Sequence, residues 1–252
     1  MGVKKAATTA QYTTTFVELE SGNRFSFEMK EVNAVNISFG WIIAMATAPG
    51  LLLLMWFYHK DVLDPEPLNL VVSSFFRGAL FVFPAGLLEG MTGPFLITLS
   101  PLFYPFIGIA VIEEGLKWLA LKRYILHPAC DECYDGIVYG TGVALGFATL
   151  ENLMYLVGSI NPWAVAGWRA LLSVPLHGLC GLFMGYEAAR QKQTEGGPVR
   201  VFSILALPVA AHGAYNLLLF TGTAWGVLSA VGLVGLLWIK AFGTIKRSRT
   251  CS

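Results

Sequence analysis

Apolar stretches long enough to cross a lipid bilayer recur along this chain of 252 residues. A transmembrane helix needs about 20 consecutive residues that are mostly apolar. Hydrophobic residues make up 55% of the sequence and charged residues 13%, which is about half the charged fraction of an average soluble protein. The alternating pattern of a transmembrane β-barrel is absent from the sequence. The sequence therefore predicts an all-α fold, a polytopic bundle of transmembrane helices.

About seven spans can be read from the hydropathy pattern. Their predicted ranges are 37–58, 70–91, 95–121, 135–157, 164–188, 201–220 and 224–242. The connections are short, so sequential helices should pack as antiparallel neighbours in one transmembrane domain over residues 37–243. The polar residues 1–36 form an N-terminal segment, predicted to be a small hairpin or disordered. Residues 244–252 form a basic C-terminal tail.

The positively charged residues predict how the bundle lies in the cell membrane. They gather after the third, fifth and seventh spans, whose ends share one side of a seven-span bundle. These residues are Lys122, Arg123, Arg190, Lys192, Arg200, Lys246, Arg247 and Arg249. The positive-inside rule makes that side cytoplasmic, and the C-terminus with it. Lys4 and Lys5 leave an eighth membrane element or the reverse topology open. The net charge of +1 does not indicate a nucleic-acid partner.

Two cysteines, Cys130 and Cys133, form a CxxC motif in a polar loop. With His127 they provide three ligands, one fewer than a typical structural zinc site needs. A redox pair is the second alternative. The third, and the simplest, is that they are two unrelated loop thiols.

Ionisable and amide side chains interrupt four of the predicted spans. A charged group at membrane depth costs at least about 2.5 kcal/mol, so such groups usually face the interior of a bundle and have a function. The residues are Glu113, Glu114 and Lys117 in one span, Glu151 and Asn152 in the next, His177 in a third, and His212 and Asn216 in a fourth. Carboxylates and imidazoles that converge from separate spans are typical of a hydrolytic or a proton-handling site.

Glu113 and Glu114 cannot point in the same direction, because adjacent residues on a helix are about 100° apart. One carboxylate can face the site while the other braces a neighbouring helix. Lys117 lies four residues after Glu113 and three after Glu114, so it can reach either of them on the same face. Such a pairing lowers the cost of burying charge in the membrane.

The carboxylate of Glu151 has several alternative roles. It can be a metal ligand, a general base or the group that orients a histidine, or it can simply make a structural hydrogen bond to Arg169 or Tyr155. His177 and His212 lie in consecutive spans at comparable depth. Asn216 follows His212 by one turn on the same face, where an amide can hold an imidazole tautomer or donate to an oxyanion.

Other residues of these spans are predicted to be structural. Gly178, Gly181 and Gly185 give the fifth span a smooth face that lets another helix come close. Arg169 and Glu89 lie near the outer ends of their spans, where pairing with other polar groups is the simpler expectation.

The buried groups can support hydrolysis in two ways. A glutamate that activates water, with histidine or asparagine as the oxyanion partner, needs no metal and no covalent intermediate. Alternatively, His177, His212 and Glu151 could hold a zinc ion, with a second glutamate as the base. The HExxH spacing that favours zinc is absent, and both mechanisms stay open. Two other classes also stay open: a transporter or channel that uses the same groups as a proton or cation relay, and a binding module without activity.

Five motifs follow one another along these spans. They are EExxK from Glu113, DGIVYG from Asp135, GFATLEN ending at Asn152, the single His177, and HGAYN from His212. With the DPEP segment before the second span, this order resembles the PrsW family of membrane proteases, which are distant relatives of the CAAX prenyl endopeptidases and bacteriocin-processing enzymes. The resemblance covers about residues 64–216.

The resemblance implies an intramembrane endopeptidase that cuts a membrane-anchored protein, for example an anti-sigma-factor-like regulator. It would make Glu113, Glu114, Glu151, His177 and His212 the active site. The CxxC motif and the long N-terminal segment depart from the family pattern, which leaves regulation and topology open. The resemblance does not indicate an oligomeric state.

Overall fold

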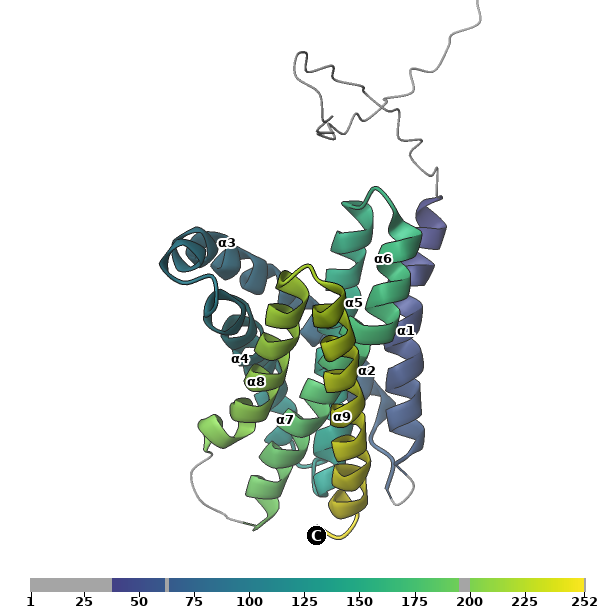
Figure 1. Cartoon of the computed structure of the whole chain (residues 1–252). Helices are drawn as coiled ribbons and strands as arrows, with labels where there is room; N and C mark the ends of the chain where they lie inside the picture. The colour runs from purple at the N-terminus through teal and green to yellow at the C-terminus, as the bar shows by residue number, and fades with distance from the viewer. Residues whose placement is uncertain (1–37, 62–63, 195–199, 252) are drawn as a thin grey trace, which may run out of the picture.

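The part of the chain that the structure describes is built from helices. The computed structural model describes residues 38–61, 64–194 and 200–251, and none of these residues lies in a β-strand. The all-α, polytopic bundle predicted from the sequence is confirmed (Figure 1). The hairpin or disorder predicted for residues 1–36 falls outside the described residues and stays a prediction.

The described residues form nine α-helices and two π-helical segments. In chain order they are α1 (Phe39–His59), α2 (Leu68–Leu80), α3 (Val82–Leu99), η1 (Tyr104–Ala110), α4 (Val111–Ile125), α5 (Cys133–Val157), α6 (Pro162–Trp168), η2 (Arg169–Ser173), α7 (Val174–Thr194), α8 (Val201–Phe220) and α9 (Ala224–Ser248). Within the described residues, five stretches are long and apolar enough to cross a membrane: α1, the α2–α3 run, α5, α8 and α9. The two other long stretches, η1–α4 and α6–α7, carry most of the ionisable groups predicted to form the site.

The predicted boundary between the second and third spans is wrong. The hydropathy pattern ends one span at residue 91 and begins the next at 95, but α3 continues to Leu99 and η1 starts at Tyr104. Pro94 lies inside α3 and does not end it. Membrane helices tolerate proline because neighbouring groups can satisfy the freed backbone carbonyl. The helix ends instead at Ser100, whose backbone is extended.

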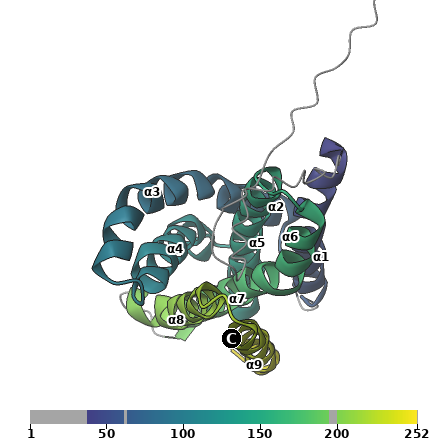
Figure 2. The same cartoon turned by 45° about the horizontal axis from the view of Figure 1, so that its top comes forward.

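The central helix of the bundle is α5, which packs against α1, α2 and α7 (Figure 2). Glycines allow the closest of these approaches. A Cβ atom on Gly140 would lie 2.2 Å from the carbonyl oxygen of Gly181, and one on Gly185 would lie 1.8 Å from that of Gly136. The smooth face predicted for the fifth span is therefore confirmed at Gly181 and Gly185, which contact the backbone of α5.

Substituting Gly185 by alanine is expected to destabilise the bundle. The new methyl group would overlap a backbone carbonyl of α5, which cannot move aside as a side chain can. Overpacking of this kind costs about 1–3 kcal/mol, so the midpoint of thermal unfolding in detergent should fall. The matched control is Gly232→Ala on α9, because a Cβ atom there would meet open space. Equal midpoints for the two variants would contradict the close contact between α5 and α7.

The two cysteines of the CxxC motif are not paired with each other. Cys133 forms a disulfide with Cys251, which joins the start of α5 to the C-terminal end of the described chain. Cys130 is a free, buried thiol, and its carbonyl oxygen accepts a hydrogen bond from Lys192. Burial raises the pKa of the Cys130 thiol to about 12, so this thiol stays protonated and unreactive at neutral pH. The structure contradicts a redox pair made of Cys130 and Cys133.

Candidate active site

The predicted site residues come from four different helices. Glu113 and Glu114 lie in the first turn of α4, Glu151 in α5, His177 in α7 and His212 in α8. The π-helical segments η1 and η2 lead directly into α4 and α7, so each ends about one turn before a site residue. Irregular turns of this type occur frequently at functional sites.

Lys117 lies at the centre of the site. Its Nζ atom is 3.0 Å from Glu113 Oε2, 2.8 Å from Glu114 Oε1 and 2.8 Å from His177 Nδ1. An ammonium group has three N–H donors, and these three contacts use all of them. Nζ also lies 4.3 Å from the centre of the Phe147 ring. Only 1% of Lys117 is exposed, so the two carboxylates hold a full positive charge inside the bundle.

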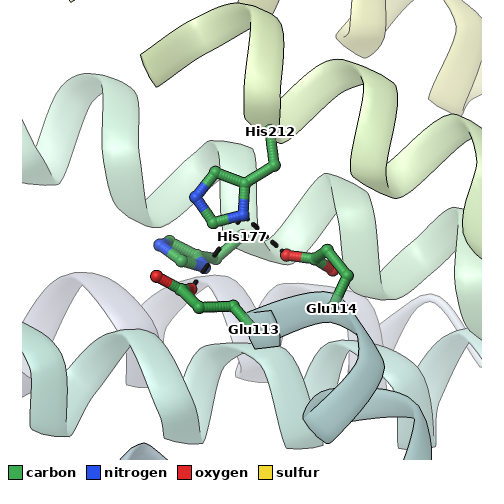
Figure 3. Close-up of side chains that lie close together, drawn as sticks. All are labelled: Glu113, Glu114, His177 and His212. Atoms are coloured by element: carbon green, nitrogen blue, oxygen red, sulfur yellow. Dashed lines mark hydrogen bonds and ion pairs between the residues drawn. The ribbon is translucent and has the colours of Figure 1, made fainter. Parts of the chain in front are cut away.

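The two adjacent glutamates have different surroundings (Figure 3). Glu114 is fully buried, and its Oε1 also binds His212 Nδ1 at 2.8 Å. Glu113 Oε2 lies 4.0 Å from the same nitrogen, and Glu113 forms part of a cavity wall. One glutamate therefore faces the cavity while the other braces α8, which is the division that adjacent helical positions allow.

Glu151 approaches His177 from the opposite side. Its Oε2 lies 3.1 Å from His177 Nε2 and 3.0 Å from a terminal nitrogen of Arg169. Arg169 also donates a hydrogen bond through Nε to the amide oxygen of Asn152. The Asn152 side chain is buried and does not form part of the cavity wall. His177 Nδ1 accepts a hydrogen bond from Lys117, because an ammonium can only donate, so Nε2 carries the ring proton and faces the Glu151 carboxylate. Both ring nitrogens are engaged, which fixes the tautomer and the orientation of the ring.

A cavity of about 740 Å³ opens beside these residues. The predicted site residues in its wall are Glu113, Glu151, His177, His212 and Asn216. The remaining wall is mostly apolar and comes from η1 and η2 and from α3, α5, α6, α8 and α9. An apolar cavity of this size with a few convergent polar groups is typical of a ligand or substrate site.

Several polar residues of the cavity wall were not predicted to belong to the site. They include Glu89, Arg169, Ser173 and Tyr215. The Glu89 carboxyl has one buried oxygen without a hydrogen-bond partner among the described residues, and the hydroxyl groups of Ser173 and Tyr215 lie 3.0 Å apart. A charged residue in an apolar span can indicate a functional residue, and this signal was present for Glu89 and Arg169. Their positions near the predicted ends of spans suggested structural roles instead. Ser173 and Tyr215 are uncharged and carry no such signal.

Four groups gather closely enough to hold a metal ion. They are Glu113, Glu114, His177 and His212, whose ligand atoms all lie within 4.8 Å of one another. Glu151, which the sequence suggested as a zinc ligand with the two histidines, is outside this group because it binds the far nitrogen of His177. Three of the four groups already bind the Lys117 ammonium, so the residues do not fit a metal ion while Lys117 stays in place.

The sequence is similar to known membrane proteases. Residues 66–242 match the family described as PrsW family intramembrane metalloprotease. Proteins named Protease PrsW are 36% identical to this chain in Geobacillus kaustophilus, over 82% of the chain and 92% of the relative, and in Bacillus subtilis, over 84% and 96%. The protein of the same name from Clostridioides difficile is 30% identical over 78% of the chain and 87% of the relative. No solved structure matches the chain. The extent of the family match and these identities show that the chain belongs to the PrsW family of intramembrane proteases.

Proposed function

We propose that this protein hydrolyses a peptide bond of a membrane-anchored protein inside the cavity, with Glu113 as the base that activates water. Membership of the PrsW family makes the protein a membrane peptidase. The observation that carries the finer proposal is that Glu113, and not Glu114, forms part of the cavity wall. Family membership also favours hydrolysis over the transporter or channel that the same buried groups allowed.

Glu113 is placed to move the proton that hydrolysis requires. As the water oxygen bonds to the carbonyl carbon of the substrate, one water proton passes to the Glu113 carboxylate. When the C–N bond breaks, this proton passes to the leaving nitrogen, and Glu113 returns to its starting charge. Lys117 holds the carboxylate 3.0 Å away in a fixed orientation throughout. This step needs neither a covalent intermediate nor a metal ion.

His212 and Asn216 are the proposed partners of the developing oxyanion. Both form part of the cavity wall, and they lie one turn apart on α8. His212 Nδ1 binds Glu114, which leaves Nε2 for the substrate. Donation from Nε2 requires that the ring carries both protons, and the ring is then an imidazolium paired with the Glu114 carboxylate. The amide of Asn216 supplies a second donor.

Glu151, Arg169 and His177 are proposed to position the catalytic groups. His177 has no free ring nitrogen, so it acts on the reaction through Lys117. Glu151 keeps the His177 ring in place, and Arg169 balances the Glu151 charge at 3.0 Å. The chain of contacts from Arg169 to Glu113 therefore serves to fix one ammonium and one carboxylate.

The position of the cavity bears on where the substrate is cut. Its wall includes Ala164 near the start of α6, Phe220 at the end of α8 and Val227 near the start of α9. In Figure 1 these helix ends lie opposite the C-terminal end of α9. With the C-terminus proposed to be cytoplasmic from the charge distribution, the cut would fall in the outer half of the membrane.

Co-reconstitution of the purified protein with single-span membrane proteins would test the proposed function. The expected result is that at least one single-span protein is cut into two fragments without any change in the permeability of the vesicles. The same vesicles would carry a pH-sensitive dye inside, to detect a proton flux. Proton flux without fragments, across a panel of such substrates, would contradict the proposal and support the relay alternative.

A further inference from the structure

The groups that could hold a metal ion are bound instead to a cation that belongs to the protein. Lys117 Nζ lies within 3.0 Å of Glu113 Oε2, Glu114 Oε1 and His177 Nδ1, which are three of the four groups that gather for a metal. We propose that the Lys117 ammonium is the resident cation of this site and occupies the place that a metal ion would need. The protein would then work without a metal, although its family is described as metalloproteases.

The distances make the ammonium and a metal ion mutually exclusive. Nitrogen and oxygen ligands hold zinc at about 2.0–2.2 Å, so an ion bound to the same three atoms would lie within roughly 3 Å of Nζ. Two cations at this separation repel each other strongly in an environment of low dielectric, and the three ligand atoms cannot serve both at full strength. A metal ion could enter only if Lys117 left its three partners.

Lys117 has no other place in the site to go. Its side chain is 1% exposed, and the neighbouring Phe147 ring, 4.3 Å from Nζ, is itself buried. All three N–H donors are satisfied where they are. Displacing the ammonium would leave an unpaired charge inside the bundle, which costs at least several kcal/mol.

The ring of His177 provides a second argument, which also depends on Lys117. A histidine binds a metal through a ring nitrogen that carries no proton. Nε2 faces the Glu151 carboxylate at 3.1 Å, and Nδ1 accepts a hydrogen bond from Lys117 at 2.8 Å. The ring therefore has no lone pair left for a metal. Among the candidate ligands in the described residues, His212 Nε2 is the one histidine ring nitrogen without a hydrogen-bond or ion-pair partner, and one nitrogen does not make a metal site.

The same geometry predicts what happens when the lysine is removed. Glu113, Glu114, His177 and His212 would keep ligand atoms within 4.8 Å of one another, and the space of the ammonium would become free. Two imidazoles and two carboxylates are a suitable set for zinc or cobalt. Lys117→Ala should therefore create a metal site that the natural protein does not have.

Metal content of the wild-type protein is the first test. The protein, purified in detergent without chelators, is expected to contain far less than one equivalent of zinc when its metal content is measured by inductively coupled plasma mass spectrometry. Titration with Co²⁺ should give no visible d–d absorption, and 1,10-phenanthroline should leave peptide cleavage unchanged. One tightly held equivalent of zinc, or cleavage that chelator abolishes and zinc restores, would overturn the proposal. This test needs no variant and so does not depend on the folding of one.

The second test compares Lys117→Ala with two matched variants. Titration of Lys117→Ala with Co²⁺ is expected to give the absorption of a tetrahedral site at one equivalent. Lys122→Ala, an exposed lysine of the same helix, should give none. The double variant with His177→Ala should lose the absorption, because a ligand is missing. Lack of Co²⁺ binding by a folded Lys117→Ala would show that the four groups do not form a site without the lysine, and would overturn this part of the proposal.

The inference concerns the site of the proposed function, but its test reads metal binding and not only activity. A protein that binds no metal and cuts no substrate would leave the inference standing and remove the proposed function. A protein that cuts its substrate only with zinc bound would do the reverse.

Discussion

Replacing Glu113 with glutamine is expected to reduce kcat for peptide cleavage by about 10²–10⁴-fold, the range for loss of a general base. The amide of glutamine has nearly the same size, and its oxygen can still accept the hydrogen bond from Lys117. It cannot take a proton from water. Since Glu113 is the glutamate in the cavity wall, the loss should appear in kcat, while the thermal unfolding midpoint changes little. Initial rates at several substrate concentrations, measured with unfolding curves, would check this.

The neighbouring glutamate provides the comparison. Glu114→Gln is expected to lose less activity than Glu113→Gln, because its amide oxygen can still accept hydrogen bonds from Lys117 and His212. Glu187→Gln on α7 is the outer control, since Glu187 pairs with Arg190 and is not part of the cavity wall; its rate should be unchanged. A larger loss for Glu114→Gln than for Glu113→Gln would reverse the proposed roles.

Replacing His212 with alanine is expected to lower kcat by about 10²–10³-fold, the range for loss of one oxyanion donor. KM should change much less, because the His212 contact strengthens only as negative charge develops on the carbonyl oxygen. Steady-state kinetics would separate the two parameters. A rise in KM at constant kcat would instead assign His212 to substrate binding.

A double variant tests whether Glu114 acts through His212. Glu114 Oε1 binds both His212 Nδ1 and Lys117 Nζ at 2.8 Å. If the contact with His212 carries most of its effect, the combined loss in Glu114→Gln/His212→Ala should be smaller than the product of the two single losses. A combined loss equal to that product would mean that the two residues act independently.

The class of fold and the gathering of the buried ionisable side chains were predictable because charge is so costly in lipid. Ionisable residues stand out in apolar spans because their side chains cannot reach bulk water at membrane depth. Here these residues are Glu113, Glu114, Glu151, His177 and His212. They come together in the structure because such groups must find one another or water. For the same reason the helical bundle followed from hydropathy alone, whereas the predicted boundary between residues 91 and 95 was wrong because α3 continues to Leu99.

Which glutamate faces the cavity, and which side chains contact each other within the site, could not be predicted from one sequence. Helix geometry gives the angle between Glu113 and Glu114 but not which direction meets the cavity, because that depends on how α4 is rotated against α5, α7 and α8. The contact between Lys117 and His177 joins residues far apart in the sequence, and helical spacing reveals only the two glutamate partners. The pairing of Cys133 with Cys251 depends in the same way on where α9 ends.

Mass spectrometry of the cleavage products tests the central claim most directly. The purified protein and a single-span substrate would be reconstituted in the same vesicles, and the new N-terminus of the substrate would be sequenced. Hydrolysis in the cavity at Glu113 predicts one new terminus within or at the edge of the membrane segment, and none with Glu113→Gln. Cuts confined to the soluble domain of the substrate, or the same fragments from Glu113→Gln, would contradict a hydrolytic site at membrane depth.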